Sequence, residues 1–181
     1  MTRALTYPLV LTGATVRLRE WREQDAPLLV SLFDDPEVRR WTPMPNPFDL
    51  PAAEGYLERA RQARLGGHRV QLAITRDGDE PLGEVLLFGI DHERSEAELG
   101  YVVGAAHRGK GLAAESLTLL QEYAHRTLRP ARLLLRIDPG NAASCAVARR
   151  CGFTLTDEPP VPQQVPGGEA NLRTWELLLR E

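Results

Sequence analysis

The stretch Arg108-Gly109-Lys110-Gly111-Leu112-Ala113 lies where a strand-like run ends and a long helix-like run begins. Lys110 is the one lysine of the chain and stands between two glycines, whereas arginine supplies the other permanently positive side chains. Glycines let backbone amides approach a ligand closely, and a helix start carries unpaired N–H groups at the positive end of the helix dipole. The stretch therefore predicts an anion-binding turn of the kind that holds phosphate oxygens, with a simple tight turn as the alternative.

Length and composition favour an ordinary cytoplasmic domain. The 181 residues are 43% hydrophobic, so we expect one domain over residues 1–181. The net charge of -3 combines 22 basic and 25 acidic residues without blocks, which argues against nucleic acid and anionic membranes as partners. Cys145 and Cys151 lack the close spacing of zinc or redox motifs, so we expect reduced thiols. No apolar run is long enough to span a membrane, and residues 1–3 open no signal-peptide pattern.

The periodicity of apolar residues predicts a mixture of helices and strands. Alternation over residues 82–90 and 96–103, after a strand at 70–74, indicates three successive strands, for which a meander is the simplest arrangement. Spacings of three to four residues over 112–128 indicate a helix with one buried face. The other predicted elements are strands at 16–21, 132–137, 153–155 and 172–179, helices at 28–33, 35–41, 51–63 and 141–150, and a loop at 158–168.

Two nucleotide-binding motifs come close to this turn and fail. Residues 104–110 fit the glycines and lysine of a P-loop, but the next residue, Gly111, lacks the hydroxyl that would hold magnesium. The dinucleotide fingerprint also fails, because no strand-ending acid lies about 20 residues further on, and Asp138 is too distant. A magnesium-dependent nucleotide enzyme is therefore the weaker interpretation.

Four motifs follow one another in the second half of the chain. They are Glu98-Leu99-Gly100-Tyr101-Val102-Val103, then Arg108-Gly109-Lys110-Gly111-Leu112-Ala113-Ala114-Glu115, then Asn141-Ala142-Ala143-Ser144, and last Arg150-Cys151-Gly152-Phe153. In this order they resemble the GNAT superfamily of acetyl-CoA-dependent N-acetyltransferases. Leu18-Arg19-Glu20-Trp21 with Asp25, and Val38-Arg39-Arg40-Trp41, are similar to the opening of the branch that contains the bacterial ribosomal-protein alanine acetyltransferases.

The resemblance implies a fold and a place for the cofactor. The implied fold is α+β, with a mixed, mostly antiparallel central sheet of about six to seven strands, about four flanking helices and splayed central strands. The pyrophosphate of acetyl-CoA would lie on the amides of residues 108–113, and its pantetheine arm along Val102 and Val103. No metal is implied. The cofactor-binding residues expected on this basis are Val102, Val103, Arg108, Gly109, Lys110, Gly111, Leu112, Ala113 and Asn141.

The resemblance also implies catalytic groups. A carboxylate on the strand of Glu98 would accept the ammonium proton, directly or through water. Glu96 shares the face of Glu98, and Glu84 on the preceding strand is a further candidate. Many members of the superfamily carry a tyrosine where this chain has Ala148, so Ser144 is the expected proton donor to the leaving thiolate. Each residue also has a structural interpretation, as a solvated carboxylate or a helix-capping side chain.

The expected reaction is N-acetylation of a primary amine, on a protein N-terminus or a small molecule, by a monomer or homodimer. An α-amine with a pKa of about 8 is roughly one-tenth neutral at pH 7, whereas a lysine amine near 10.4 costs about 3 kcal/mol more to deprotonate. A modest base therefore favours α-amines. The loops at residues 41–48 and 158–168 are expected to frame the acceptor. The alternative function is a non-catalytic acyl-CoA sensor or interaction module.

Overall fold

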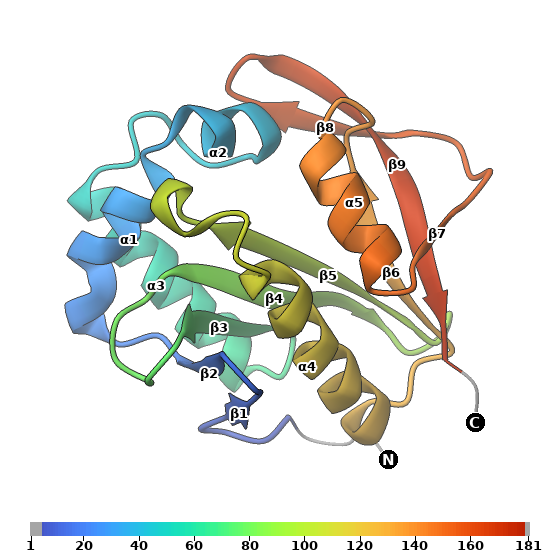
Figure 1. Ribbon diagram of the computed structural model, residues 1–181, viewed down its shortest axis with the longest axis horizontal. Coiled ribbons are helices and arrows are strands. Elements are labelled where there is room, and N and C mark those ends of the chain that lie inside the picture. Colours follow the sequence, from blue (N-terminus) through green and yellow to red (C-terminus); the bar gives the residue numbers. More distant parts are fainter. Residues whose placement is uncertain (1–4, 180–181) are drawn as a thin grey trace.

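The computed structural model describes residues 5–179, which form one continuous mixed sheet with helices on both faces (Figure 1). Over these residues there are nine strands and five α-helices, where the resemblance implied about six to seven strands and about four helices. The strands are β1 (Val10–Thr12), β2 (Arg17–Glu20), β3 (Val70–Thr75), β4 (Gly83–Asp91), β5 (Glu96–Val103), β6 (Arg132–Ile137), β7 (Thr154–Leu155), β8 (Val161–Val165) and β9 (Gly168–Leu178). The helices are α1 (Ala26–Phe33), α2 (Pro36–Trp41), α3 (Leu50–Leu65), α4 (Leu112–Thr127) and α5 (Ala142–Arg150).

The sheet has the strand order β1-β2-β3-β4-β5-β6-β9-β7, and β8 pairs with β9. The predicted meander of β3, β4 and β5 is confirmed, because each of these strands pairs antiparallel with the next. Of the strand pairs in the described chain, β5–β6 is the parallel one, and α4 supplies the crossover that a parallel pair requires. The mixed, mostly antiparallel sheet expected from the resemblance is therefore present.

The parallel pair is short, and this produces the splayed strands. Pairing runs from Glu96 opposite Arg132 to Glu98 opposite Leu134 and then ends. Strand β5 nevertheless continues to Val103. We call the point after Glu98, where β5 and β6 separate, the fork. Beyond it the facing edge of β5 has no β6 residue to pair with, so its backbone donors and acceptors are open to another partner.

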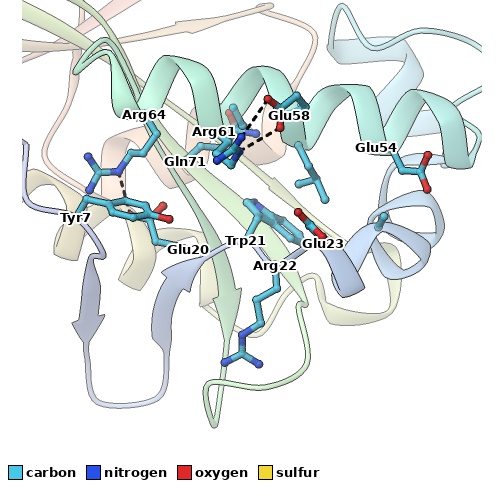
Figure 2. A pocket seen from close by; sticks show the side chains of 13 residues that line it. Tyr7, Glu20, Trp21, Arg22, Glu23, Glu54, Glu58, Arg61, Arg64 and Gln71 are labelled. Atoms are coloured by element: carbon cyan, nitrogen blue, oxygen red, sulfur yellow. Dashed lines mark hydrogen bonds and ion pairs between the residues drawn. The ribbon is translucent and has the colours of Figure 1, made fainter.

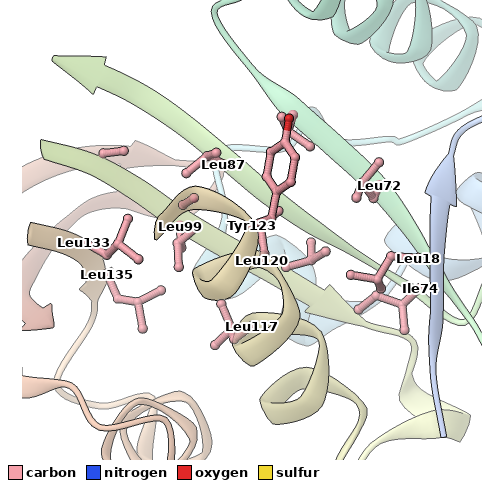
Figure 3. Packing of buried hydrophobic residues seen from close by; sticks show 14 of the residues in the cluster. Leu18, Leu72, Ile74, Leu87, Leu99, Leu117, Leu120, Tyr123, Leu133 and Leu135 are labelled. Atoms are coloured by element: carbon pink, nitrogen blue, oxygen red, sulfur yellow. The ribbon is translucent and has the colours of Figure 1, made fainter. Parts of the chain in front are cut away.

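Two hydrophobic clusters hold the sheet between its helices. On one face α4 buries Leu117 and Leu120 against strand residues such as Leu87, Leu99 and Leu133 (Figure 3). On the other face α1 and α3 enclose a second cluster around three aromatic rings. The ring centroids of Phe33, Phe48 and Tyr56 lie 5.3 to 6.0 Å apart in tilted or edge-on arrangements. Such aromatic pairs add to the energy gained from burial alone.

Two strands were not predicted. Strand β1 has three residues, too few for a periodic signal. Strand β8 lies inside the predicted loop at 158–168, so that prediction was wrong over residues 161–165. Four prolines and two glycines in residues 158–168 suggested a loop. One of them, Pro162, lies in β8 and cannot donate to a ladder of hydrogen bonds, but β8 pairs with β9 on one side only. Proline is tolerated in such an edge strand.

A buried ion pair joins strand β2 to the residue that precedes helix α1. The guanidinium of Arg19 on β2 contacts both carboxylate oxygens of Asp25, with N–O distances of 2.7 and 3.1 Å. Arg19 Nε also donates to the carbonyl of Gly78 in the β3–β4 turn, at 2.7 Å. The two side chains are only 6% and 5% exposed. Each charge is therefore satisfied by the other, and loss of one would leave the other buried and unpaired.

We expect Asp25→Ala to destabilise the protein by about 3–5 kcal/mol, because it leaves the Arg19 guanidinium buried without its counter-charge. Urea unfolding monitored by circular dichroism would measure the change. Asp34→Ala is the control, since the Asp34–Arg39 pair is exposed and should contribute about 0–1 kcal/mol. Equal losses for the two variants would contradict the account.

Candidate active site

The glycine turn after β5 has the geometry predicted for an anion site. Gly109 and Gly111 have φ angles of +74° and +78°, in the left-handed region that glycine adopts without strain. No atom lies within 4 Å of a Cβ built at either position, so conformation rather than crowding requires glycine. Gly111 is the N-cap of α4, and no side chain caps that helix end. The first amide groups of α4 are therefore left for a ligand.

A cavity of about 390 Å³ opens in front of this turn. Helix α2, the end of β5, the start of α4 and helix α5 form its walls. Of the nine residues predicted to bind the cofactor, eight line the cavity; the exception, Lys110, donates from Nζ to the carbonyl of Ala106 at 2.9 Å. The eight are Val102, Val103, Arg108, Gly109, Gly111, Leu112, Ala113 and Asn141.

Asn141 and Ser144 face the cavity from the start of α5. The Asn141 side chain accepts a hydrogen bond from the Ser144 backbone N–H at 3.1 Å, so Asn141 caps the N-terminus of α5. The Tyr101 hydroxyl donates to the Ser144 carbonyl at 3.4 Å, and burial raises the pKa of Tyr101 to about 12. The Tyr101 contact connects β5 to α5. Its partner, Ser144, lies at the wall of the cavity.

Glu98, the predicted base, is the last β5 residue before the fork and is not among the residues that line the cavity. Its carboxylate accepts a hydrogen bond from Nε of Arg136 on β6, at 2.9 Å. Burial raises the pKa of Glu98, and the neighbouring Arg136 acts in the opposite direction. The side chain is 20% exposed, so water can reach this ion pair. Glu98 therefore lies beside the fork, with its carboxylate in an ion pair with Arg136.

The two other candidate carboxylates differ in their surroundings. Glu96 forms an ion pair with Arg132 at 2.8 Å, and Arg132 also contacts Glu158 and Glu176. Glu84 is fully buried, and its oxygens accept hydrogen bonds from the Tyr56 hydroxyl at 2.6 Å and from the side-chain amide of Gln71 at 2.8 Å. Burial raises the pKa of Glu84 to about 7. Glu84 lies directly opposite Val102 in the β4–β5 ladder, so it is one strand away from the cavity wall.

Sequence reasoning missed part of one wall of the cavity. Helix α2 contributes Glu37 and Val38 to the lining, and neither was expected near a ligand; Trp41 and Thr42, which also line the cavity, belong to the predicted loop at 41–48. Arg150 of α5 also lines the cavity; it belongs to a quoted motif but received no role. Arg150 could have been found from its type, because an arginine in the last turn of a helix beside a phosphate site suggests a second cation. Nothing in α2 itself indicates a ligand.

A second cavity of about 320 Å³ lies between α3 and the end of β2 (Figure 2). Its walls carry two ion pairs, Arg61 with Glu58 at 3.1 Å and Arg64 with Glu20 at 2.9 Å. It shares no lining residue with the first cavity, and none of the predicted site residues lines it. Among residues 5–179 no cluster of three or more His, Cys, Asp or Glu side chains could hold a metal ion. Over the same residues, no helix is both long and apolar enough to cross a membrane.

Comparisons with known proteins agree with this geometry. An N-acetyltransferase of Bacillus licheniformis, the uncharacterized protein p20, is 28% identical over 165 residues, which are 91% of this chain and 93% of that protein. The structure of the microcin C7 self-immunity acetyltransferase MccE in complex with acetyl-CoA and AMP superposes with a TM-score of 0.83 at 22% identity, over 92% of this chain and 94% of that one. The structure of RimL, a ribosomal L7/L12 α-N-protein acetyltransferase in complex with coenzyme A, superposes with a TM-score of 0.83 at 21% identity, over 94% and 98%.

At such identities the two structures establish the fold, which is the one that the sequence motifs implied. The family is established separately, by a family model described as an acetyltransferase (GNAT) domain that matches residues 15–154. The matched residues include the fork, the glycine turn and helix α5. Because they make up most of the chain, the protein belongs to the GNAT acetyltransferase family.

Proposed function

We propose that this protein transfers the acetyl group of acetyl-CoA to a primary amine, by direct attack of the amine within a ternary complex. The observation that carries the proposal is the glycine turn, with two positive φ angles at an uncapped helix start, opening into a cavity that continues along β5. An elongated ligand with a diphosphate and an amide-containing arm would match both parts. Bound acetyl-CoA supplies the activated acetyl thioester.

The residues of the chain fit this ligand in sequence along the cavity. The amides at the start of α4 attract a diphosphate through their free N–H groups and the helix dipole. Arg108 and Arg150 add positive charge to the lining. Further in, Val102 and Val103 follow the fork, where the edge of β5 offers backbone groups to an amide-rich arm. A backbone N–H near Val102 would stabilise the negative charge that develops on the carbonyl oxygen during attack.

Proton transfers are assigned to side chains around the fork. Glu98 accepts a proton from the substrate ammonium, directly or through a water molecule, so that the neutral amine can attack; its 20% exposure leaves room for that water. Its ion pair with Arg136 favours the ionised form, which a base needs, although burial outweighs this effect and raises the pKa of Glu98 overall. Glu84 is the alternative base; burial raises its pKa to about 7, but it has no exposed surface. Ser144, at the cavity wall, would donate its hydroxyl proton to the leaving thiolate.

The acceptor is proposed to be an α-amine. A base of modest strength works best on an amine that is already partly neutral, and α-amines meet this condition near pH 7. The RimL structure supports the proposal, since its name gives an α-N-protein acetyltransferase. Helix α2, which leads into the loop at residues 41–48, contacts β8, which lies within the segment 158–168. A cytoplasmic location remains a prediction from the sequence.

A non-catalytic acyl-CoA sensor is the second candidate, favoured by Ala148, which is buried where many members of the superfamily carry a tyrosine. Such a module would keep the diphosphate site but release no thiol. Thiol release from acetyl-CoA over a panel of amines separates the two functions. We expect release that depends on the amine; coenzyme A binding without any release would favour the sensor.

We expect turnover of α-amines to exceed that of lysine ε-amines of similar size, because the ε-amine costs about 3 kcal/mol more to deprotonate. Initial rates over peptides with a free N-terminus, peptides with one free lysine, and small amines would measure the preference. Each peptide should be blocked at the other amine as a control. Equal or faster acetylation of the ε-amines would contradict the proposed acceptor.

We expect Gly109→Val and Gly111→Val to weaken coenzyme A binding by about tenfold or more. A side chain in the left-handed region costs about 1–2 kcal/mol, and a rearranged turn no longer presents its amides to phosphate. Because neither position is crowded, the variants should still fold. Isothermal titration with coenzyme A would measure the change, with Glu98→Gln as the comparison that leaves binding nearly intact. If Glu98→Gln weakened binding more than the glycine variants, the assigned roles would be misplaced.

We expect Glu84 to make the stability of the protein fall as the pH rises. Folding raises the pKa of Glu84 from its ordinary value to about 7, so the folded state holds this proton more tightly than the unfolded state. The resulting stabilisation, about 3 kcal/mol at most, is fully present below about pH 4.5 and is lost as the pH rises through 7. Melting temperatures from pH 5 to 8 should therefore decline less for Glu84→Gln than for the wild type. Glu93→Gln, on the exposed surface, should follow the wild type; the same decline in all three proteins would contradict the prediction.

A further inference from the structure

Asp35 joins two walls of the cofactor cavity without lining the cavity itself. One of its carboxylate oxygens accepts hydrogen bonds from the backbone N–H groups of Glu37 and Val38, at 2.8 and 3.2 Å, and so caps α2. The same oxygen accepts a hydrogen bond from Arg108 Nη2 at 3.1 Å. The Asp35 side chain is 15% exposed and the Arg108 side chain 38%, so the carboxylate is largely shielded from water while the guanidinium is partly open to it. The cap of α2 is therefore also the anchor of the first residue of the glycine turn.

Arg108 completes the connection on the other side. Its Nε donates to the carbonyl of Val103 at 2.9 Å, so one guanidinium links the last residue of β5 to the start of α2. The backbone between these elements is close-packed as well, because a Cβ added to Gly104 would lie 2.4 Å from the Leu32 side chain of α1. A planar guanidinium held at two points has little freedom to rotate. The peptide that leads into Gly109 is therefore held in one orientation.

The charge of Asp35 alone would not favour an anion nearby. Burial raises its pKa, but the hydrogen bonds from Arg108 and from the α2 amides outweigh that effect, and the net pKa is lowered. The carboxylate is therefore ionised near neutral pH, and it would repel a diphosphate. If charge decided the outcome, neutralising Asp35 would strengthen diphosphate binding. If orientation of the turn decided it, neutralising Asp35 would weaken binding.

We propose that Asp35 is a positioning residue for the diphosphate site: through Arg108 it holds the glycine turn in the orientation that presents its amides to the cavity. The inference rests on the proposed function, since it assumes that the turn binds the diphosphate of acetyl-CoA. It goes further by assigning a role to a residue that touches no ligand. The proposal thereby connects the site to a residue 73 positions earlier in the chain.

Titration of coenzyme A by calorimetry tests the proposal in three variants and the wild type. Asp35→Asn keeps an oxygen that can cap α2 but loses the charge that holds Arg108, so we expect a dissociation constant about fivefold higher with an unchanged melting temperature. Asp35→Ala should weaken binding to a similar extent and also lower the melting temperature, because the cap is lost. Asp34→Asn is the matched control: it removes the same charge from the adjacent residue, which pairs with Arg39 instead, and should bind within about twofold of the wild type.

A double-mutant cycle separates a role through Arg108 from a general effect on structure. In an Arg108→Gln background, Asp35→Asn should cause no further loss of affinity, because the contact is already absent. Unchanged or tighter binding by Asp35→Asn, equal losses in Asp34→Asn, or additive losses in the cycle would each overturn the proposal. Failure of the wild type itself to bind coenzyme A would overturn the proposed function instead.

Discussion

The separation of β5 from β6 at the fork is the constraint on which the rest of the structure depends. A parallel pair of strands gains hydrogen bonds for as long as it continues. The β5–β6 pairing nevertheless ends at Glu98, while β5 continues to Val103. Hydrophobic clusters on both faces bury residues of the strands around this point. Unpaired backbone groups in a partly buried place are costly unless they find partners. One edge of β5 is therefore left for a ligand whose amide groups can pair with a strand.

Charge around the cavity differs in sign from charge on the whole molecule. The chain carries a net charge of -3, but the cavity lining includes Arg108 and Arg150 against one acid, Glu37. The turn adds the partial positive charge of a helix start. A chain with an acidic balance can therefore present a local attraction for phosphate. The carboxylates near the fork are either paired, as Glu98 is, or deeply buried, as Glu84 is, so they oppose this attraction little.

Much of the fold and about half of the residues that line the cavity could be predicted from the sequence, because the information is local. Gly109 and Gly111 are required by backbone angles in their own turn, and the strand before them and the helix after them have clear periodicities. Partners distant in the chain could not be predicted. Nothing in the sequence indicates that Arg136 engages Glu98, or that α2 forms a cavity wall. The burial of Glu84 could not be predicted either, because the local sequence Gly83-Glu84-Val85 does not indicate that the Tyr56 hydroxyl donates a hydrogen bond to this carboxylate.

The β8 strand was hidden for a related reason. Proline argued for a loop, and the argument holds for strands that have neighbours on both sides. Strand β8 has β9 on one side, and its outer edge carries no partner strand in the described chain. An open edge of this kind invites strands of other molecules to add to the sheet. Pro162 has no backbone N–H to offer at this edge. The proline that argued against a strand therefore also disfavours the addition of a strand from another molecule.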